Sequence, residues 1–263
     1  MRRVGVLVGT TIAMFGAIAG FSEVNSSEVE KTVLRSDSSQ VKQVSPSILS
    51  LEEQCSFLYD SLQLRELGLS KEAFRYAWFG FQQANFEKPI LAIADFSQSA
   101  NNKRLYVIDF AENKLIYHTY VAHGRNSGQE YARKFSNVTS SYQSSLGFYR
   151  ALSTYQGKHG LSLKLEGLER NINDRAFDRA IVMHGADYVS EDFIRQHGRL
   201  GRSLGCPAVP VEDHQKVISL LNGGAALFLY YPDAAYLSKS PILQKALAQR
   251  QETGASSSYT SSK

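Results

Sequence analysis

The spacing of apolar residues divides the chain into a helical part and a strand-rich part. Over residues 50–85, apolar side chains recur at helical spacing and form one stripe of Phe74, Ala77, Trp78 and Phe81. Ser50 and Ser70 are each followed by acidic residues, which indicates capped helix starts, and Gly68 separates the two candidate helices. The pattern therefore predicts a helical pair within residues 48–88 that packs its stripe against the next domain.

From residue 90 onward, apolar residues gather in short runs rich in β-branched and aromatic side chains, which favour strands. These runs cover residues 90–96, 105–110, 115–122, 147–152, 161–165, 180–184 and 225–231. Short helices are predicted over residues 190–197 and 211–221. We therefore expect residues 89–232 to form a mainly β domain with helices at its margins.

The first residues have the layout of a secretory signal. Arg2 and Arg3 precede an uncharged run over residues 4–21, which contains a small-x-small triplet at 17–19. We expect residues 1–19 to be a signal peptide that is cleaved. The alternative is an uncleaved membrane anchor, because the run is close to the shortest length that spans a bilayer.

Composition indicates which parts of the chain fold and which kinds of partner the protein is expected to bind. Hydrophobic residues make up 43% of the 263 positions, so the chain can build a core. The polar residues 20–47 are expected to form a flexible linker, and residues 233–263 a helical segment with a Ser-rich tail. A net charge of +4 is too small to predict nucleic-acid binding, and no membrane span is expected once the signal is cleaved.

The chain has two cysteines, Cys55 and Cys206, which could form one disulfide or act separately. Cys55 lies beside Phe57 and Leu58 in the first predicted helix, and we interpret it as a small core residue. A thiol titration of the protein distinguishes the two cases, because a disulfide would leave no free thiol.

The residues around Cys206 are those that a cysteine nucleophile requires. Gly201 and Gly205 allow the backbone to turn tightly, so that N–H groups can face a reacting carbonyl. Arg199 and Arg202 add positive charge, which lowers the pKa of a thiol. The alternative interpretation is a structural cysteine buried in a Gly/Pro turn.

A candidate general base precedes this segment. His184 ends the predicted strand 180–184 and is followed by Gly185, so its ring is held at the end of a rigid element. A lone histidine at a strand end is more often structural, and His-Gly pairs also occur at residues 123, 159 and 197. Order is more informative: His184 lies 22 residues before Cys206, whereas papain-like and NlpC-type peptidases have the cysteine first.

A His-Gly pair followed after about twenty residues by Ser-x-Gly-Cys resembles the signature of the YkuD-type L,D-transpeptidases. Further matching stretches lie at residues 121–128, 135–137, 144–149, 157–160 and 182–210. The resemblance extends over about residues 50–232. It implies a β-sandwich or β-barrel catalytic domain with flanking helices and an N-terminal helical pair.

The resemblance also implies a chemistry. In that family, a cysteine thiolate attacks the bond between an L-centred diamino acid and D-Ala in a cell-wall tetrapeptide, and the acyl group then passes to an amine. Carried over, Cys206 is the nucleophile and His184 the base. Ser203 and the backbone of Leu204, Gly205 and Cys206 would shape the oxyanion site.

The residues expected to bind substrate are His123, Ser144, Gly147, Gly185, Arg199, Arg202 and Leu204. The chain departs from many relatives at two places, with Leu204 in place of His and with Pro207 and Ala208 directly after the cysteine. The usual substrate-binding side chain after the cysteine is therefore missing. We expect Arg202, Arg199 or His123 to recognise substrate carboxylates instead.

Two other functions remain open at this point. Water could resolve the same acyl-enzyme, which would make the protein an L,D-carboxypeptidase, or the domain could bind the wall without catalysis. The scattered histidines do not have metal-ligand spacing and no phosphate-binding loop is present, so no cofactor is expected. The expected partners are peptidoglycan stem peptides, the expected location is periplasmic or cell-wall-associated, and the oligomeric state is left undetermined.

Overall fold

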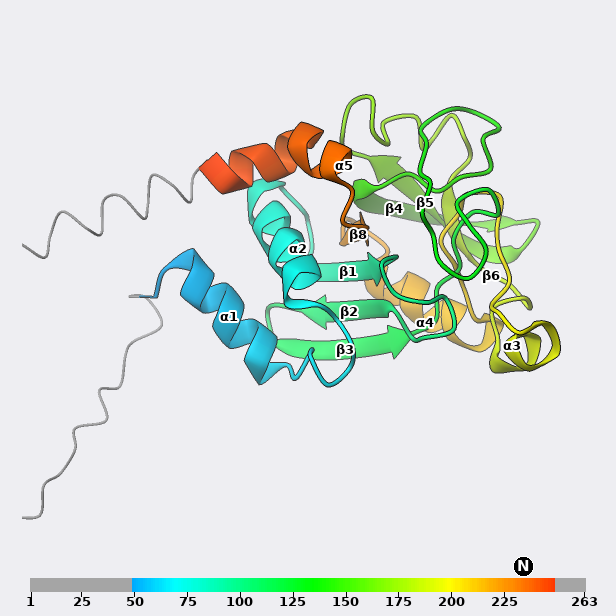
Figure 1. Ribbon diagram of the computed structural model, residues 1–263, viewed down its shortest axis with the longest axis horizontal. Helices are drawn as coiled ribbons and strands as arrows, with labels where there is room; N and C mark the ends of the chain where they lie inside the picture. The colour runs from blue at the N-terminus through cyan, green and yellow to red at the C-terminus, as the bar shows by residue number, and fades with distance from the viewer. Residues whose placement is uncertain (1–48, 249–263) are drawn as a thin grey trace, which may run out of the picture. The chain divides into compact units, whose positions relative to one another are not determined.

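A computed structural model describes residues 49–248 of the protein (Figure 1). The predicted signal peptide, the linker and the Ser-rich end of the chain lie outside the described residues. No helix among residues 49–248 combines the length and the apolar character needed to cross a bilayer.

One eight-stranded sheet forms the centre of the described protein (Figure 1). Its strands are β1 (Ile90–Asp95), β2 (Leu105–Asp109), β3 (Lys114–Thr119), β4 (Gly147–Gly157), β5 (Gly160–Gly167), β6 (Val182–Gly185), β7 (Ala208–Val209) and β8 (Ala226–Tyr230). Their order in space is β3-β2-β1-β8-β4-β5-β6-β7. Neighbours are antiparallel except for β1 with β8 and β6 with β7, which are parallel.

The segments that continue the two edge strands meet through two bridges, Ala122 with Ala208 and Gly124 with Ser203. The backbone N–H of Ala122, just after β3, donates to the carbonyl of Ala208 in β7 at 2.8 Å. Because β3 and β7 are the two edge strands, this contact nearly closes the sheet into a barrel. The mainly β fold predicted from the sequence is confirmed.

Helices cover both faces of the sheet (Figure 1). They are α1 (Leu51–Ser61), α2 (Lys71–Gln83), α3 (Glu191–His197), α4 (Val211–Leu221) and α5 (Ala234–Lys239), and residues 241–248 are also helical. Ser50 and Ser70 cap α1 and α2 as predicted, Ser50 through a reciprocal capping box with Glu53.

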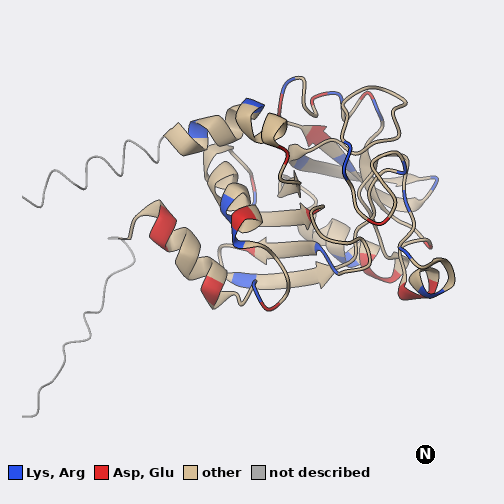
Figure 2. Ribbon diagram, in the orientation of Figure 1, with Lys and Arg blue, Asp and Glu red and all other residues tan. Residues whose placement is uncertain are grey.

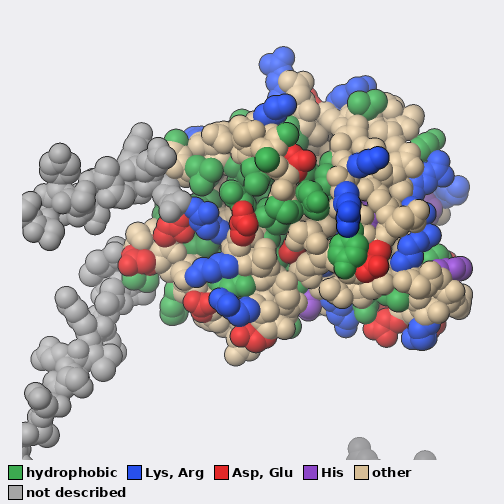
Figure 3. All heavy atoms as spheres, viewed as in Figure 1, with side chains coloured by type: hydrophobic (Ala, Val, Ile, Leu, Met, Phe, Trp, Pro, Cys, Tyr) green, Lys and Arg blue, Asp and Glu red, His purple; other side chains and the backbone are tan. Residues whose placement is uncertain are grey.

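Side chains that point alternately to the two faces of the sheet form two separate hydrophobic cores. In β1, Ile93 packs with α1, α2 and α5, while its neighbour Ala94 points to the core that contains α4. In the first core, Phe148 of β4 stacks on Phe228 of β8 with ring centroids 4.2 Å apart. Burying each of these rings contributes on the order of 1.5–3 kcal/mol to the stability of the fold. Some hydrophobic side chains also lie at the surface, over α2 (Figure 3).

The cysteines lie in separate parts of this architecture. Cys55 is 2% exposed in α1 within the first core, as the sequence predicted. Both cysteines are free thiols, so the alternative of a Cys55–Cys206 disulfide is wrong for this structure.

Candidate active site

Cys206 lies in a tight turn directly before β7, at the closure of the sheet. Its side chain is partly exposed, and its Sγ lies 3.7 Å from the carbonyl oxygen of Ala180. Gly205 has φ +126°, and a Cβ there would lie 2.9 Å from the carbonyl oxygen of Gln143. This position therefore requires glycine for both conformation and space.

Ser203 holds the turn together from within. Its Oγ donates to the carbonyl of Cys206 at 2.6 Å and accepts from the N–H of Gly205 at 3.0 Å. Its backbone N–H donates to the carbonyl of His123 at 2.9 Å, and its carbonyl accepts from the N–H of Arg125 at 2.8 Å. The segment after β3 thus fixes the cysteine turn on one side.

These bonds change the predicted oxyanion donors. The N–H of Gly205 is occupied by Ser203, so it is not free to face a substrate carbonyl. Within residues 49–248, no acceptor pairs with the N–H groups of Leu204 and Cys206. Two donors therefore remain of the three that the sequence suggested, and the Leu204 side chain beside them is 58% exposed.

His184 lies on the strand next to the turn. In the parallel β6–β7 register it is opposite Ala208, two residues after Cys206. Its Nδ1 lies 3.0 Å from the carbonyl oxygen of Gly185. A carbonyl can only accept, so Nδ1 carries the proton in this arrangement and Nε2 is left as a base.

The environment of His184 favours its neutral form. Burial lowers the pKa of the imidazole, and nearby His159 and His214 lower it further, while the bond to Gly185 opposes these effects. The Cys206 sulfur bonds to Ala180 and not to the imidazole. Such hydrogen bonds in enzymes often tighten only when substrate is bound.

Arg179, which the sequence analysis missed, supplies positive charge near the sulfur. Burial raises the pKa of the Cys206 thiol, whereas the backbone N–H of Val182 and the guanidinium of Arg179 lower it. Arg179 is held in place by bonds to the carbonyls of Gln143 at 2.6 Å and Ser136 at 2.8 Å. The sequence signal that could have identified Arg179 was its position directly before the predicted strand 180–184.

The two arginines predicted for this role bond elsewhere. Arg199 donates to the carbonyl of Leu200 at 2.9 Å. Arg202 donates to the carbonyls of Arg125 and Gly128, each at 3.0 Å. The predicted source of the positive charge near the thiol is therefore corrected from Arg199 and Arg202 to Arg179.

His159 is a second residue that the sequence analysis set aside. It is exposed at the tip of the β4–β5 hairpin, and its ring stacks on that of His184 with centroids 4.5 Å apart. On the other side, a Cβ on Gly185 would meet the ring of His214 at 2.8 Å. Gly185 is therefore needed for packing beside the histidine.

Besides Gly185, three predicted substrate contacts are buried in the structure. Ser144 is 0% exposed, and its Oγ donates to the carbonyl of Gly205 at 3.2 Å and accepts from the N–H of Gly124 at 3.0 Å. Gly147 is buried at the start of β4 against Glu169. These two residues support the site without facing a substrate, which corrects their predicted role.

His123 is the third. It is 0% exposed, and its Nδ1 lies 2.8 Å from Nη2 of the buried Arg104. Burial and the Arg104 charge lower the pKa of His123 to about 3, so it is neutral. The expectation that His123 touches a substrate carboxylate is contradicted by this burial.

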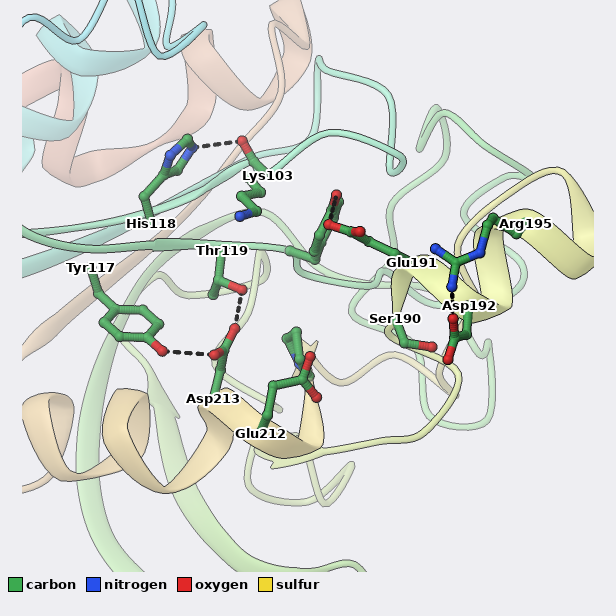
Figure 4. Close-up of a pocket in the computed structure, with 12 residues that line it drawn as sticks. Lys103, Tyr117, His118, Thr119, Ser190, Glu191, Asp192, Arg195, Glu212 and Asp213 are labelled. Carbon is green, nitrogen blue, oxygen red and sulfur yellow. Dashed lines mark hydrogen bonds and ion pairs between the residues drawn. The ribbon is translucent and has the colours of Figure 1, made fainter.

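A cavity of about 500 Å³ lies away from these residues (Figure 4). It is lined by polar and charged side chains of β3, α3 and the start of α4, and neither Cys206 nor His184 borders it. Asp213 accepts from Tyr117 at 2.7 Å and also from Thr119, and Asp192 pairs with Arg195. Its acidic groups are thus largely satisfied, and residues 49–248 contain no cluster of three possible metal ligands.

Residues 65–230 match the model of the family described as L,D-transpeptidase catalytic domain. No curated protein matches the chain.

Several solved structures are similar to the chain. An L,D-transpeptidase from Mycobacterium smegmatis matches with 12% identity and a TM-score of 0.35, covering 55% of this chain and 59% of that one. The helical cell shape determining protein Pgp2 from Campylobacter jejuni matches with 11% identity and a TM-score of 0.38, covering 70% and 63%. An L,D-transpeptidase from Stackebrandtia nassauensis matches with 15% identity and a TM-score of 0.34, covering 70% and 80%. The chain thus spans about three fifths of the length of the first two structures.

Proposed function

Because this chain belongs to the L,D-transpeptidase catalytic domain family, we propose that it cuts and rejoins peptide bonds of peptidoglycan stem peptides through Cys206. The observation that carries the proposal is the parallel pairing of β6 with β7, which sets His184 beside the turn that carries a partly exposed free thiol. The substrate expected from the resemblance is a tetrapeptide stem that ends in D-Ala.

The first step is acylation of the cysteine. Nε2 of His184 takes the thiol proton, and the sulfur attacks the carbonyl carbon that precedes D-Ala. As the tetrahedral intermediate collapses, the C–N bond breaks, the D-Ala nitrogen takes the proton from His184, and D-Ala leaves. A thioester to Cys206 remains.

The resting state supports general-base activation of a neutral thiol. The Cys206 pKa is raised and the His184 pKa is lowered, so the pair favours thiol and imidazole over thiolate and imidazolium. Arg179 then offsets part of the cost of forming the thiolate during attack. The free N–H groups of Leu204 and Cys206 are the candidate donors to the oxyanion.

The second step transfers the acyl group. A primary amine from a neighbouring stem gives a proton to His184 and attacks the thioester carbonyl, the C–S bond breaks, and Cys206 recovers the proton. The result is a cross-link that needs no nucleotide. If water replaced the amine, the same intermediate would give a tripeptide, and the protein would act as an L,D-carboxypeptidase.

The cellular setting follows from the same proposal. An enzyme that acts on wall peptides works outside the cytoplasm, and the basic and apolar start of the sequence is suited to export. We therefore propose a periplasmic or wall-associated location.

Incubation with disaccharide tetrapeptide and mass analysis of the products tests the function. Dimers with loss of D-Ala support transpeptidation, and tripeptides alone support carboxypeptidation. Cys206→Ser and His184→Ala should abolish both products. Cys55→Ala, which alters the other free cysteine, is the matched control and should retain them. Absence of an acyl adduct on Cys206 in the active wild-type protein would contradict the proposal.

A further inference from the structure

A second cavity lies beside the segment that carries Cys206. It has a volume of about 450 Å³ and is bordered by residues 125–131, by residues 133 and 134, and by Arg202. Four cationic side chains line it, namely Arg125, Arg133, Lys134 and Arg202. Lys and Arg recur on the loops at this end of the molecule, opposite α1 (Figure 2).

The cavity has an excess of positive charge. Within residues 49–248, none of its four cations forms an ion pair with a carboxylate. Its single acidic residue, Glu130, already accepts a hydrogen bond from Ser99. Burial is the main cause that lowers the pKa of Arg202, and the like charges of Arg199 and Arg125 lower it further. A bound anion would relieve this repulsion.

A buried polar atom next to the cavity lacks a partner. Because Nδ1 of His123 faces the guanidinium of Arg104, which only donates, the proton of this neutral ring is on Nε2. His123 Nε2 has no hydrogen-bond partner among the described residues. The ring lies near the backbone of Gly128 and Gln129, which border the cavity. This buried N–H donor lies behind the cationic lining, covered by the backbone of the cavity wall, and does not itself reach the cavity.

The cavity is also joined to the cysteine turn. The N–H of Arg125 donates to the carbonyl of Ser203 at 2.8 Å, and Arg202 donates to two carbonyls of the cavity wall. Ser203 lies three residues before Cys206, a separation that spans at most about 10 Å of chain. The separation between Cys206 and the cavity wall is therefore within the length of an extended tetrapeptide.

We propose that this cavity binds a carboxylate of the stem peptide whose carbonyl reacts at Cys206. The inference rests on the proposed function, because it takes the same peptide as the ligand. Arginine forms paired hydrogen bonds with carboxylates, and a wall tetrapeptide carries carboxylates within this reach of its reacting bond. The cavity thereby replaces the side chain that many relatives have after the cysteine.

Binding to the Cys206→Ala protein tests the site without turnover. The probes are a wall tetrapeptide with free carboxylates and the same peptide with its carboxylates amidated, titrated by calorimetry. We expect the amidated peptide to bind about tenfold more weakly, which corresponds to about 1.4 kcal/mol. Arg133→Gln with Lys134→Gln should remove most of this difference and leave the bonds of Arg202 intact.

Arg170→Gln with Lys245→Gln is the matched control, because it removes the same charge from exposed positions outside the cavity. Equal binding of the two peptides, no measurable binding of either, or an equal loss in the control would overturn the proposal. Displacement of the peptide by lower concentrations of inorganic phosphate would also overturn it, in favour of a phosphate-bearing ligand. If wild-type protein releases no D-Ala while the binding difference persists, the proposed function fails and the carboxylate site stands.

Discussion

The ring of His159 stacks on the ring of His184, with centroids 4.5 Å apart and planes inclined by 23°. His159 comes from the β4–β5 hairpin, and His184 from β6, the strand that pairs with β5. A second imidazole therefore covers the candidate base, and its electrostatic effect lowers the pKa of His184.

His159→Phe should move the acid limb of the pH profile of kcat/KM to higher pH. The phenyl ring keeps the stack, but it removes a group that lowers the pKa of His184, so the base becomes protonated at a higher pH. The measurement is kcat/KM for D-Ala release between about pH 4 and pH 8. His197→Phe, at the end of α3, is the control and should leave the limb in place; an unchanged limb in His159→Phe would count against the assignment.

Arg179→Gln should slow alkylation of Cys206 at neutral pH and shift its pH dependence upward. The guanidinium lowers the thiol pKa, which burial raises, so the pKa of Cys206 should rise when the guanidinium is removed. Arg179→Lys keeps the charge and should recover part of the rate. The assay is iodoacetamide modification of Cys206 against pH.

Arg170→Gln removes an exposed arginine and serves as the control for that assay. Because Arg179 also bonds to the carbonyls of Ser136 and Gln143, thermal unfolding of each variant should be recorded alongside. If the Gln and Lys variants alkylate at the same rate, the role of Arg179 is structural and not electrostatic.

Ser203→Ala should lower both stability and turnover. It removes the acceptor of the Gly205 N–H and the donor to the Cys206 carbonyl, so two backbone groups lose their partner. We expect a loss of about 1–3 kcal/mol in the free energy of unfolding, measured by urea denaturation, and a larger fall in kcat than in affinity. Ser238→Ala, at an exposed position of α5, should change neither quantity.

Glu169→Gln should loosen the attachment of α5. The buried carboxylate accepts from the N–H of Phe148 at 2.7 Å and from the hydroxyls of Tyr236 and Ser240. An amide replaces one accepting oxygen with a donor, so at least one of these partners is left unpaired, at a cost of about 1–3 kcal/mol. Proteolysis after residue 233 should accelerate, whereas Glu66→Gln, at an exposed position, should have no effect.

Short-range patterns predicted most of the elements. The helical stripe of Phe74, Ala77 and Trp78 is buried as expected, because a helix repeats its face every three to four residues. The strand expected over 115–122 ends instead at Thr119, where the chain leaves the sheet to form the Ala122 bridge. The strand expected to end near residue 152 continues to Gly157 as one side of a hairpin.

The sequence by itself determined the kinds of element, the glycine-flanked turn at Cys206 and the candidate base His184, because each depends on residues close together in the chain. The tertiary structure alone decided which distant groups meet there. It set Arg179 beside the sulfur and His159 on the base, and it buried His123 beneath the surface. These outcomes follow from strand order and register across the nearly closed sheet, which depend on pairings between segments far apart in the chain.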